Sequence, residues 1–184
     1  LTVAWEYEPA QEPDPAWPEP GRELHRMDFD FAFHPVVAGG LVFLGSSADD
    51  TVRALSEQTG EVKWSFTVGG PVRFAPHVKD GRCFFASDDG RVYALDAATG
   101  KLLWRFKAAD RNDRMIGNGR LISSWPCRSG VLVEGDVVYA TAGMWPAMGV
   151  HVFALDAATG RLLWRNDTAN AKFFALPHGG AYGI

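Results

Sequence analysis

The chain has 184 residues, of which 47% are hydrophobic and 22% charged, a composition typical of a folded globular protein with a sizeable core. Its formal net charge is −4 and it has no basic run, so nucleic acid is not an expected partner. No apolar stretch reaches about 18 residues, so the sequence predicts no membrane-spanning helix. No signal peptide is recognisable within it.

The first residues read as the end of one repeat followed by a linker. Trp5-Glu-Tyr resembles Trp64-Ser-Phe and Trp104-Arg-Phe further along, so residues 1–8 are predicted to be the last strand of a preceding repeat. Five of the 11 prolines lie between residues 9 and 22, and residues 9–28 are therefore predicted to be a proline-rich linker.

Three similar stretches follow, TVRALSEQTGEVKW at 51–64, RVYALDAATGKLLW at 91–104 and HVFALDAATGRLLW at 151–164. In each, a run rich in β-branched and aromatic residues predicts a strand, and the segment ending in Thr-Gly predicts a turn into a second strand. The two-residue period of that second strand places Leu102 and Trp104 on one face. Since one hairpin cannot bury its own tryptophan, each tryptophan is expected to pack on the next repeat, where Ala and Gly leave room.

Each repeat also contains an earlier hairpin, with a Gly/Asp turn between two short apolar runs. A unit of roughly 40 residues with four strands is typical of a propeller blade. The sequence therefore predicts an all-β fold of four-stranded antiparallel blades, an arc of about three from a larger propeller. The predicted segments are blade 1 at 29–68, blade 2 at 71–107, an inserted loop at 108–126, blade 3 at 127–168 and the start of a following blade at 169–184.

The shared pattern Ala-x-Asp-x-x-Thr-Gly-x-x-x-Trp resembles the tryptophan-docking motif of the PQQ-type, quinoprotein-like β-propeller repeat family. Ser56 stands where the first copy should have Asp. The resemblance covers roughly residues 29–168 and is greatest to large bacterial propellers of undefined activity. The motif residues are Ala54, Thr59, Gly60 and Trp64; Ala94, Asp96, Thr99, Gly100 and Trp104; and Ala154, Asp156, Thr159, Gly160 and Trp164.

Two arginines, Arg73 and Arg128, occupy the same position of successive repeats, just before the first strand of a blade. That strand is innermost in a propeller, so both side chains are expected near the central funnel. Guanidinium groups bind carboxylates and phosphates in bidentate fashion, which predicts an anion site there. The alternative is that each arginine pairs with a local aspartate, such as Asp28, Asp30 or Asp110.

Further candidates lie around these arginines. Asp28, Asp30 and His34 share one strand face, where they either bind Ca²⁺, act as acid and base, or form a solvated or salt-bridged face. Trp125 and Trp145 each precede a proline in an insertion, and they either wall the funnel or cap blade 3. The histidines have no zinc-binding spacing, so no metal site is predicted, and Cys83 reads as a buried thiol.

The resemblance implies two functions. One is a binding or scaffolding module located outside the cytoplasm, in the periplasm of a bacterium, whose partners are the remaining blades of a longer chain and a protein or small anion at the funnel face. The other is a quinoprotein-like oxidoreductase that oxidises an alcohol or sugar with PQQ and calcium. Arg73 and Arg128 would suit the tricarboxylate PQQ, but the vicinal Cys-Cys pair of such enzymes does not occur here.

Overall fold

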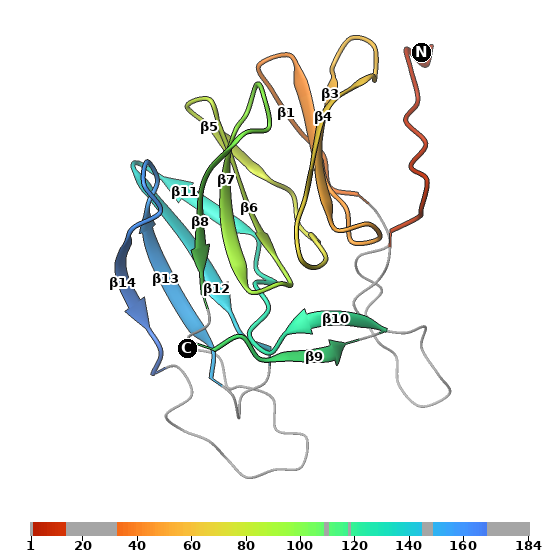
Figure 1. Ribbon diagram of the computed structural model, residues 1–184. Helices are drawn as coiled ribbons and strands as arrows, with labels where there is room; N and C mark the ends of the chain where they lie inside the picture. Colours follow the sequence, from red (N-terminus) through yellow and green to blue (C-terminus); the bar gives the residue numbers. More distant parts are fainter. Residues whose placement is uncertain (1, 14–32, 109–110, 118, 145–148, 169–184) are drawn as a thin grey trace.

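The computed structural model describes residues 2–13, 33–108, 111–117, 119–144 and 149–168. These residues form 14 strands in four antiparallel sheets and no helix, so none of them contributes a helical membrane span. The predicted all-β blade fold is confirmed. Figure 1 shows three sheets side by side, with a separate two-stranded hairpin across one end of them.

Each of the three large sheets contains four strands in chain order, and every neighbouring pair is antiparallel. The first consists of β1 (Val36–Ala38), β2 (Leu41–Gly45), β3 (Thr51–Ser56) and β4 (Val62–Thr67). The second consists of β5 (His77–Lys79), β6 (Arg82–Ser87), β7 (Arg91–Asp96) and β8 (Leu102–Lys107). The third consists of β11 (Val131–Glu134), β12 (Val137–Ala142), β13 (His151–Asp156) and β14 (Leu162–Asn166).

The segment predicted as an inserted loop contains regular structure. Strands β9 (Arg114–Gly117) and β10 (Arg120–Ser123) follow β8 in the chain and pair as an antiparallel hairpin before β11. Its Gly119 adopts a φ of 77°, which a glycine accommodates without steric cost. The Asn-Gly dipeptide at 118–119 is a hairpin signal in the sequence.

The hydrophobic cores lie between sheets. One core joins the first sheet to the second through Phe43, Val52 and Phe85. Another joins the second sheet to the third through Phe84 and Phe153. A sheet with residues of both faces buried in this way depends on its neighbours for stability, as expected for repeat proteins.

Three tryptophans repeat one contact with the next turn. The indole Nε1 of Trp64 donates to the carbonyl of Ala97 at 3.0 Å, and that of Trp104 donates to Ala157 at 3.0 Å. Trp5 makes the equivalent bond to Glu57 at 2.8 Å. Residues 2–13 contain no strand, so Trp5 reaches this position from an irregular segment rather than from the predicted strand.

The face assignment of Leu102 and Trp104 differs from the sequence prediction. Leu102 pairs with Leu95 while Trp104 pairs with Ala94, so one extra residue is accommodated between them as a β-bulge. Since adjacent residues of β7 point to opposite faces, the bulge places Leu102 on the face opposite Trp104. The same irregularity recurs between Ala54 and Leu55.

An aspartate stabilises the turns after β7 and β13. Asp96 Oδ1 accepts hydrogen bonds from the backbone N–H and the hydroxyl of Thr99 at 2.8 and 2.6 Å. Asp156 receives the same two bonds from Thr159. In the first copy Ser56 Oγ accepts one weaker bond, from a backbone N–H at 3.2 Å. The Thr99 and Thr159 bonds lower the pKa of Asp96 and Asp156 below the ordinary 3.8.

These lowered pKa values predict how stability depends on pH. A carboxylate whose pKa is lower in the folded state stabilises the fold above its unfolded pKa, and that contribution is lost as the pH falls through the folded pKa. We expect the double variant Asp96→Asn/Asp156→Asn to lose less free energy of unfolding between pH 7 and pH 3 than the unmodified chain. Urea titrations at both pH values measure this difference, and identical pH dependence would contradict it.

Gly100 gives a second prediction. Its φ is 71°, and a Cβ there would lie 2.6 Å from the Trp64 ring. Gly81 has a φ of 70°, but no atom lies within 4 Å of its would-be Cβ. Both alanine variants place a side chain in the left-handed backbone region, so they share that cost. Only Gly100→Ala also forces a methyl group into the Trp64 ring. We therefore expect Gly100→Ala to lower the free energy of unfolding by about 1–3 kcal/mol more than Gly81→Ala. Thermal melts of the two variants make the comparison, and equal losses would count against the contact.

Candidate functional site

The candidate site lies at one end of the sheets, which we call the loop face. The turns that join the second strand of a sheet to its third strand meet there with the connections from one sheet to the next. Its backbone is tied together across sheets. Val72 N–H donates to the carbonyl of Ser46 at 3.2 Å, and Cys127 N–H donates to Ser87 at 3.1 Å. The loop face consists of residues 46–50, 68–73, 87–90, 108, 111–117 and 119–128.

Arg73 and Arg128 meet on this face at one carboxylate, Asp88. Arg73 Nε lies 2.8 Å from Asp88 Oδ2, and both side chains are 1% exposed. Arg128 contacts both oxygens, with Nε 2.9 Å from Oδ1 and Nη2 2.8 Å from Oδ2. Two guanidinium groups therefore share one carboxylate.

Of the other predicted site residues, the structure describes His34 and Trp125. His34 is exposed just before β1. Trp125 is 8% exposed, and its ring centroid lies 6.4 Å from that of His151 on β13, so it packs on the third sheet. Asp30 and Trp145 lie outside the described residues, as do Asp28 and Asp110, the proposed partners of the arginines.

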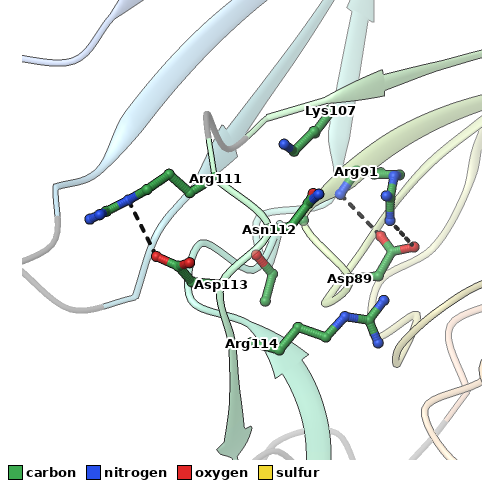
Figure 2. A pocket seen from close by; sticks show the side chains of 9 residues that line it. Asp89, Arg91, Lys107, Arg111, Asn112, Asp113 and Arg114 are labelled. Carbon is green, nitrogen blue, oxygen red and sulfur yellow. Dashed lines mark hydrogen bonds and ion pairs between the residues drawn. The ribbon is translucent and has the colours of Figure 1, made fainter.

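A polar pocket of about 290 Å³ opens beside the cluster (Figure 2). It lies between the start of β7, the end of β8 and the segment that leads into β9. Four of its side chains are cations and two are carboxylates. Its lining residues are Asp89, Gly90, Arg91, Lys107, Arg111, Asn112, Asp113, Arg114 and Ser123.

Asp89 forms the buried side of this pocket. Its carboxylate accepts hydrogen bonds from the Tyr93 hydroxyl at 2.5 Å and from the backbone N–H groups of Gly69 and Arg91 at 3.2 and 3.0 Å. Burial and this carboxylate both raise the pKa of Tyr93, which keeps the phenol protonated as the donor. Asp89 therefore joins the connection after the first sheet to the second sheet.

The β9–β10 hairpin is attached to the first sheet by Arg120. Its guanidinium donates to the carbonyls of Ser47 and Ala48 at 2.9 and 2.8 Å and forms an ion pair with Asp50. Asp50 has a φ of 58°, unusual for a non-glycine residue, and its pKa is raised by burial against the opposing effect of Arg120. The hairpin thus bridges the first and second sheets.

The two faces of this hairpin differ in burial. Ile122 is fully buried and packs against Gly117. Ile116 and Leu121 form a directly opposed cross-strand pair on the other face, and they are 79% and 53% exposed. A rigidly attached hairpin therefore displays an apolar pair to solvent on the loop face.

Sequence reasoning missed Asp88 and the pocket. It assigned no site role to Asp88, Arg91, Lys107 or Arg114. The two equivalent arginines were a partial signal, because cations that converge on one place are stabilised by a nearby carboxylate. The described residues hold no group of three metal-ligating side chains, and Cys83 and Cys127 are both buried free thiols. Burial raises the pKa of Cys83 to about 12.

Comparisons with known proteins agree with this fold. The family described as outer membrane protein assembly factor BamB matches residues 13–173. The BamB protein of Yersinia pestis is 30% identical over 158 residues, which cover 80% of this chain and 36% of that protein. The dehydrogenase subunit of the quinone alcohol dehydrogenase of Gluconobacter oxydans (strain 621H) is 27% identical over 157 residues, which cover 78% and 19%.

Among solved structures, the quinohemoprotein alcohol dehydrogenase from Comamonas testosteroni superposes with a TM-score of 0.58 and 26% identity, covering 72% of this chain and 20% of that one. This chain thus spans between 19% and 36% of the length of these relatives. The relatives include both an assembly factor and dehydrogenases, so similarity alone does not choose between the two functions.

Proposed function

Because this chain belongs to the PQQ-like propeller family described as outer membrane protein assembly factor BamB, we propose that it is a binding or scaffolding module that holds a protein partner on its loop face. By resemblance to that family, it acts outside the cytoplasm. The exposed apolar pair on the β9–β10 hairpin is the observation that carries this proposal.

The hairpin has the features of a partner-binding element. It interrupts the repeat on one face, where insertions in repeat proteins commonly form binding surfaces. Arg120 and the buried Ile122 hold it in place, so little ordering is needed when a partner binds. Ile116 and Leu121 supply apolar contact area, and the neighbouring cations of the pocket supply a polar rim.

The second candidate is a quinoprotein-like dehydrogenase, favoured by the similarity to the Gluconobacter oxydans enzyme and by the two guanidinium groups that meet on the loop face. The described residues do not fit PQQ with calcium. Asp88 already receives both arginines, and no cluster of metal-ligating side chains occurs in the described ranges. We therefore favour the binding module.

The experiment that tests the proposal compares co-precipitation by the full-length protein and by its Ile116→Ser/Leu121→Ser variant from the cell envelope of its own organism. We expect a specific partner to be captured by the unmodified protein and lost with the variant. Both substitutions lie on the exposed hairpin face, so folding should be retained.

The matched control is Leu103→Ser/Leu163→Ser. These leucines are also exposed, but they lie on the outer strands β8 and β14. The control should capture the same partner as the unmodified protein. Partner capture that survives the hairpin variant, or is lost equally in the control, would contradict the loop face as the binding surface.

The dehydrogenase alternative has its own test. Full-length protein is titrated with PQQ in millimolar Ca²⁺, and dye-linked oxidation of alcohols is followed. We expect no turnover. Micromolar PQQ binding with turnover that Arg73→Ala/Arg128→Ala abolishes would overturn the binding proposal in favour of the enzyme.

A further inference from the structure

We propose that the β9–β10 hairpin binds its protein partner by strand addition, so that an extended segment of the partner pairs with β9 as a third strand. This segment has an apolar residue opposite Ile116 and an acidic residue opposite Arg114. The inference rests on the proposed function, which places a protein partner on the loop face, and it specifies the chemistry of that partner.

The hydrogen bonds of the hairpin show which backbone groups of β9 point outward. Paired residues of an antiparallel hairpin alternate between pairs that bond to each other and pairs whose N–H and C=O groups point away. Ser123 is paired with Arg114, but its N–H donates to the Asp88 carbonyl at 2.8 Å. This pair is therefore of the outward kind, and so is the pair of Ile116 and Leu121, two residues further along.

The two edges of the hairpin differ in what they face. The β10 edge faces the large sheets, because Ser123 bonds to Asp88 there and Arg120 bonds to two carbonyls just before β3. The β9 edge lies on the side away from those sheets (Figure 1). Among the residues that the structure describes, none hydrogen-bonds to the outward backbone groups of Arg114 or Ile116. An open edge of this kind is a template for an added strand.

The outer strands of the three large sheets are less suited to such pairing. Strands β4, β8 and β14 are also sheet edges, but each contains a positively charged residue. These residues are Lys63 in β4, Arg105 in β8 and Arg165 in β14. Charges within an edge strand discourage strand addition. In β9 the charge is confined to the first residue, Arg114, and Met115, Ile116 and Gly117 follow it.

The exposed face of the hairpin defines the side chains of the partner segment. Ile116 and Leu121 are exposed and directly opposed, so an apolar residue opposite Ile116 would extend this pair across a third strand. Arg114 is exposed on the same face, because it lies two residues before Ile116. Its guanidinium forms no ion pair with a described carboxylate, and an acidic residue on the added strand would supply one.

A synthetic peptide tests the inference on the full-length protein. The probe is Val-Thr-Val-Thr-Asp-Thr-Val-Thr, with its ends acetylated and amidated, which places valine and aspartate two positions apart on one face of a strand. Isothermal titration calorimetry measures its affinity. We expect saturable binding, and the absence of saturable binding would overturn the proposal.

Two N-methylated forms of this peptide separate strand addition from simple apolar contact. One form is methylated on the amide nitrogens of the valines and aspartate, and the other on those of the threonines. Alternate N–H groups of a strand point to opposite edges, so only one set can face β9. We expect one form to bind at least about tenfold more weakly than the unmethylated peptide and the other within about threefold of it. Equal losses would overturn strand addition.

Matched proline variants test the same point on the protein. Ile116→Pro removes an outward N–H from β9 and Leu121→Pro removes one from β10, so neither breaks a bond between the two strands. We expect Ile116→Pro to weaken binding of the peptide at least about tenfold and Leu121→Pro less than about threefold. Equal weakening would count against β9 as the receiving edge.

A charge exchange tests the acidic residue of the partner segment. Arg114→Glu should bind the peptide with lysine in place of aspartate more tightly than the original peptide, because opposite charges across a strand pair attract. An unchanged preference for aspartate would show that Arg114 does not lie opposite it.

Strand addition and the proposed function fail in distinguishable ways. Partner capture that survives Ile116→Ser/Leu121→Ser would overturn the loop face as the binding surface. Capture that is lost in that variant but is normal in Ile116→Pro would keep the loop face as the binding surface and overturn only strand addition.

Discussion

Replacing Asp88 with alanine is expected to lower the free energy of unfolding by about 3–5 kcal/mol, the range for removing one partner of a buried ion pair. The aspartate is 1% exposed and receives the guanidinium groups of both Arg73 and Arg128. The variant would remove a buried carboxylate from Arg73, whose side chain is also 1% exposed. Urea denaturation of the 184-residue chain measures the loss.

Asp113→Ala is the matched control for Asp88→Ala. It also removes an aspartate paired with an arginine on the loop face, but the Asp113 and Arg111 side chains are 52% and 73% exposed. We expect a change within about 1 kcal/mol, as for most exposed ion pairs. Similar losses in the two variants would mean that the Asp88 cluster does not hold the loop face together.

The blade architecture was predictable because its signals are local. Each hairpin is specified by a turn of Gly with Asp or Thr between alternating apolar residues, and the repetition of this unit points to packed blades. The β-bulge before Trp104 could not be predicted, because the two-residue period of a strand contains no sign of an extra residue.

The chemistry of the loop face was less predictable because it depends on residues distant in the chain. Asp88 lies 40 residues before Arg128, and only folding brings the two together. Arg120 reaches carbonyls of Ser47 and Ala48, more than 70 residues away, and backbone acceptors leave no trace in a sequence. The opposed Arg91 and Lys107 were accessible in principle, since they lie on one predicted hairpin, but the bulge shifts the register that identifies them as partners.

Trp104→Ala is expected to lower the free energy of unfolding by about 3–5 kcal/mol, the range for truncating a large buried aromatic residue. Trp104 is 8% exposed, packs at 5.9 Å from the Phe84 ring, and bonds to the Ala157 carbonyl of the third sheet. The variant would leave a cavity between the second and third sheets and remove the donor from that carbonyl. Thermal and urea unfolding of the 184-residue chain both measure the loss.

Two further substitutions, on the same kind of hairpin, test whether the loss of stability depends on burial of the side chain or on the type of residue replaced. Trp164 occupies the equivalent position in the third sheet but is 47% exposed, so Trp164→Ala should cost only about 1–2 kcal/mol. Lys101→Ala, at the exposed turn before β8, should stay within about 0.5 kcal/mol. If all three variants lost similar stability, the contact of Trp104 with the third sheet would not be what stabilises the fold. The expected order, with Trp104 far above Trp164 and Lys101 near zero, follows because only Trp104 is enclosed between two sheets.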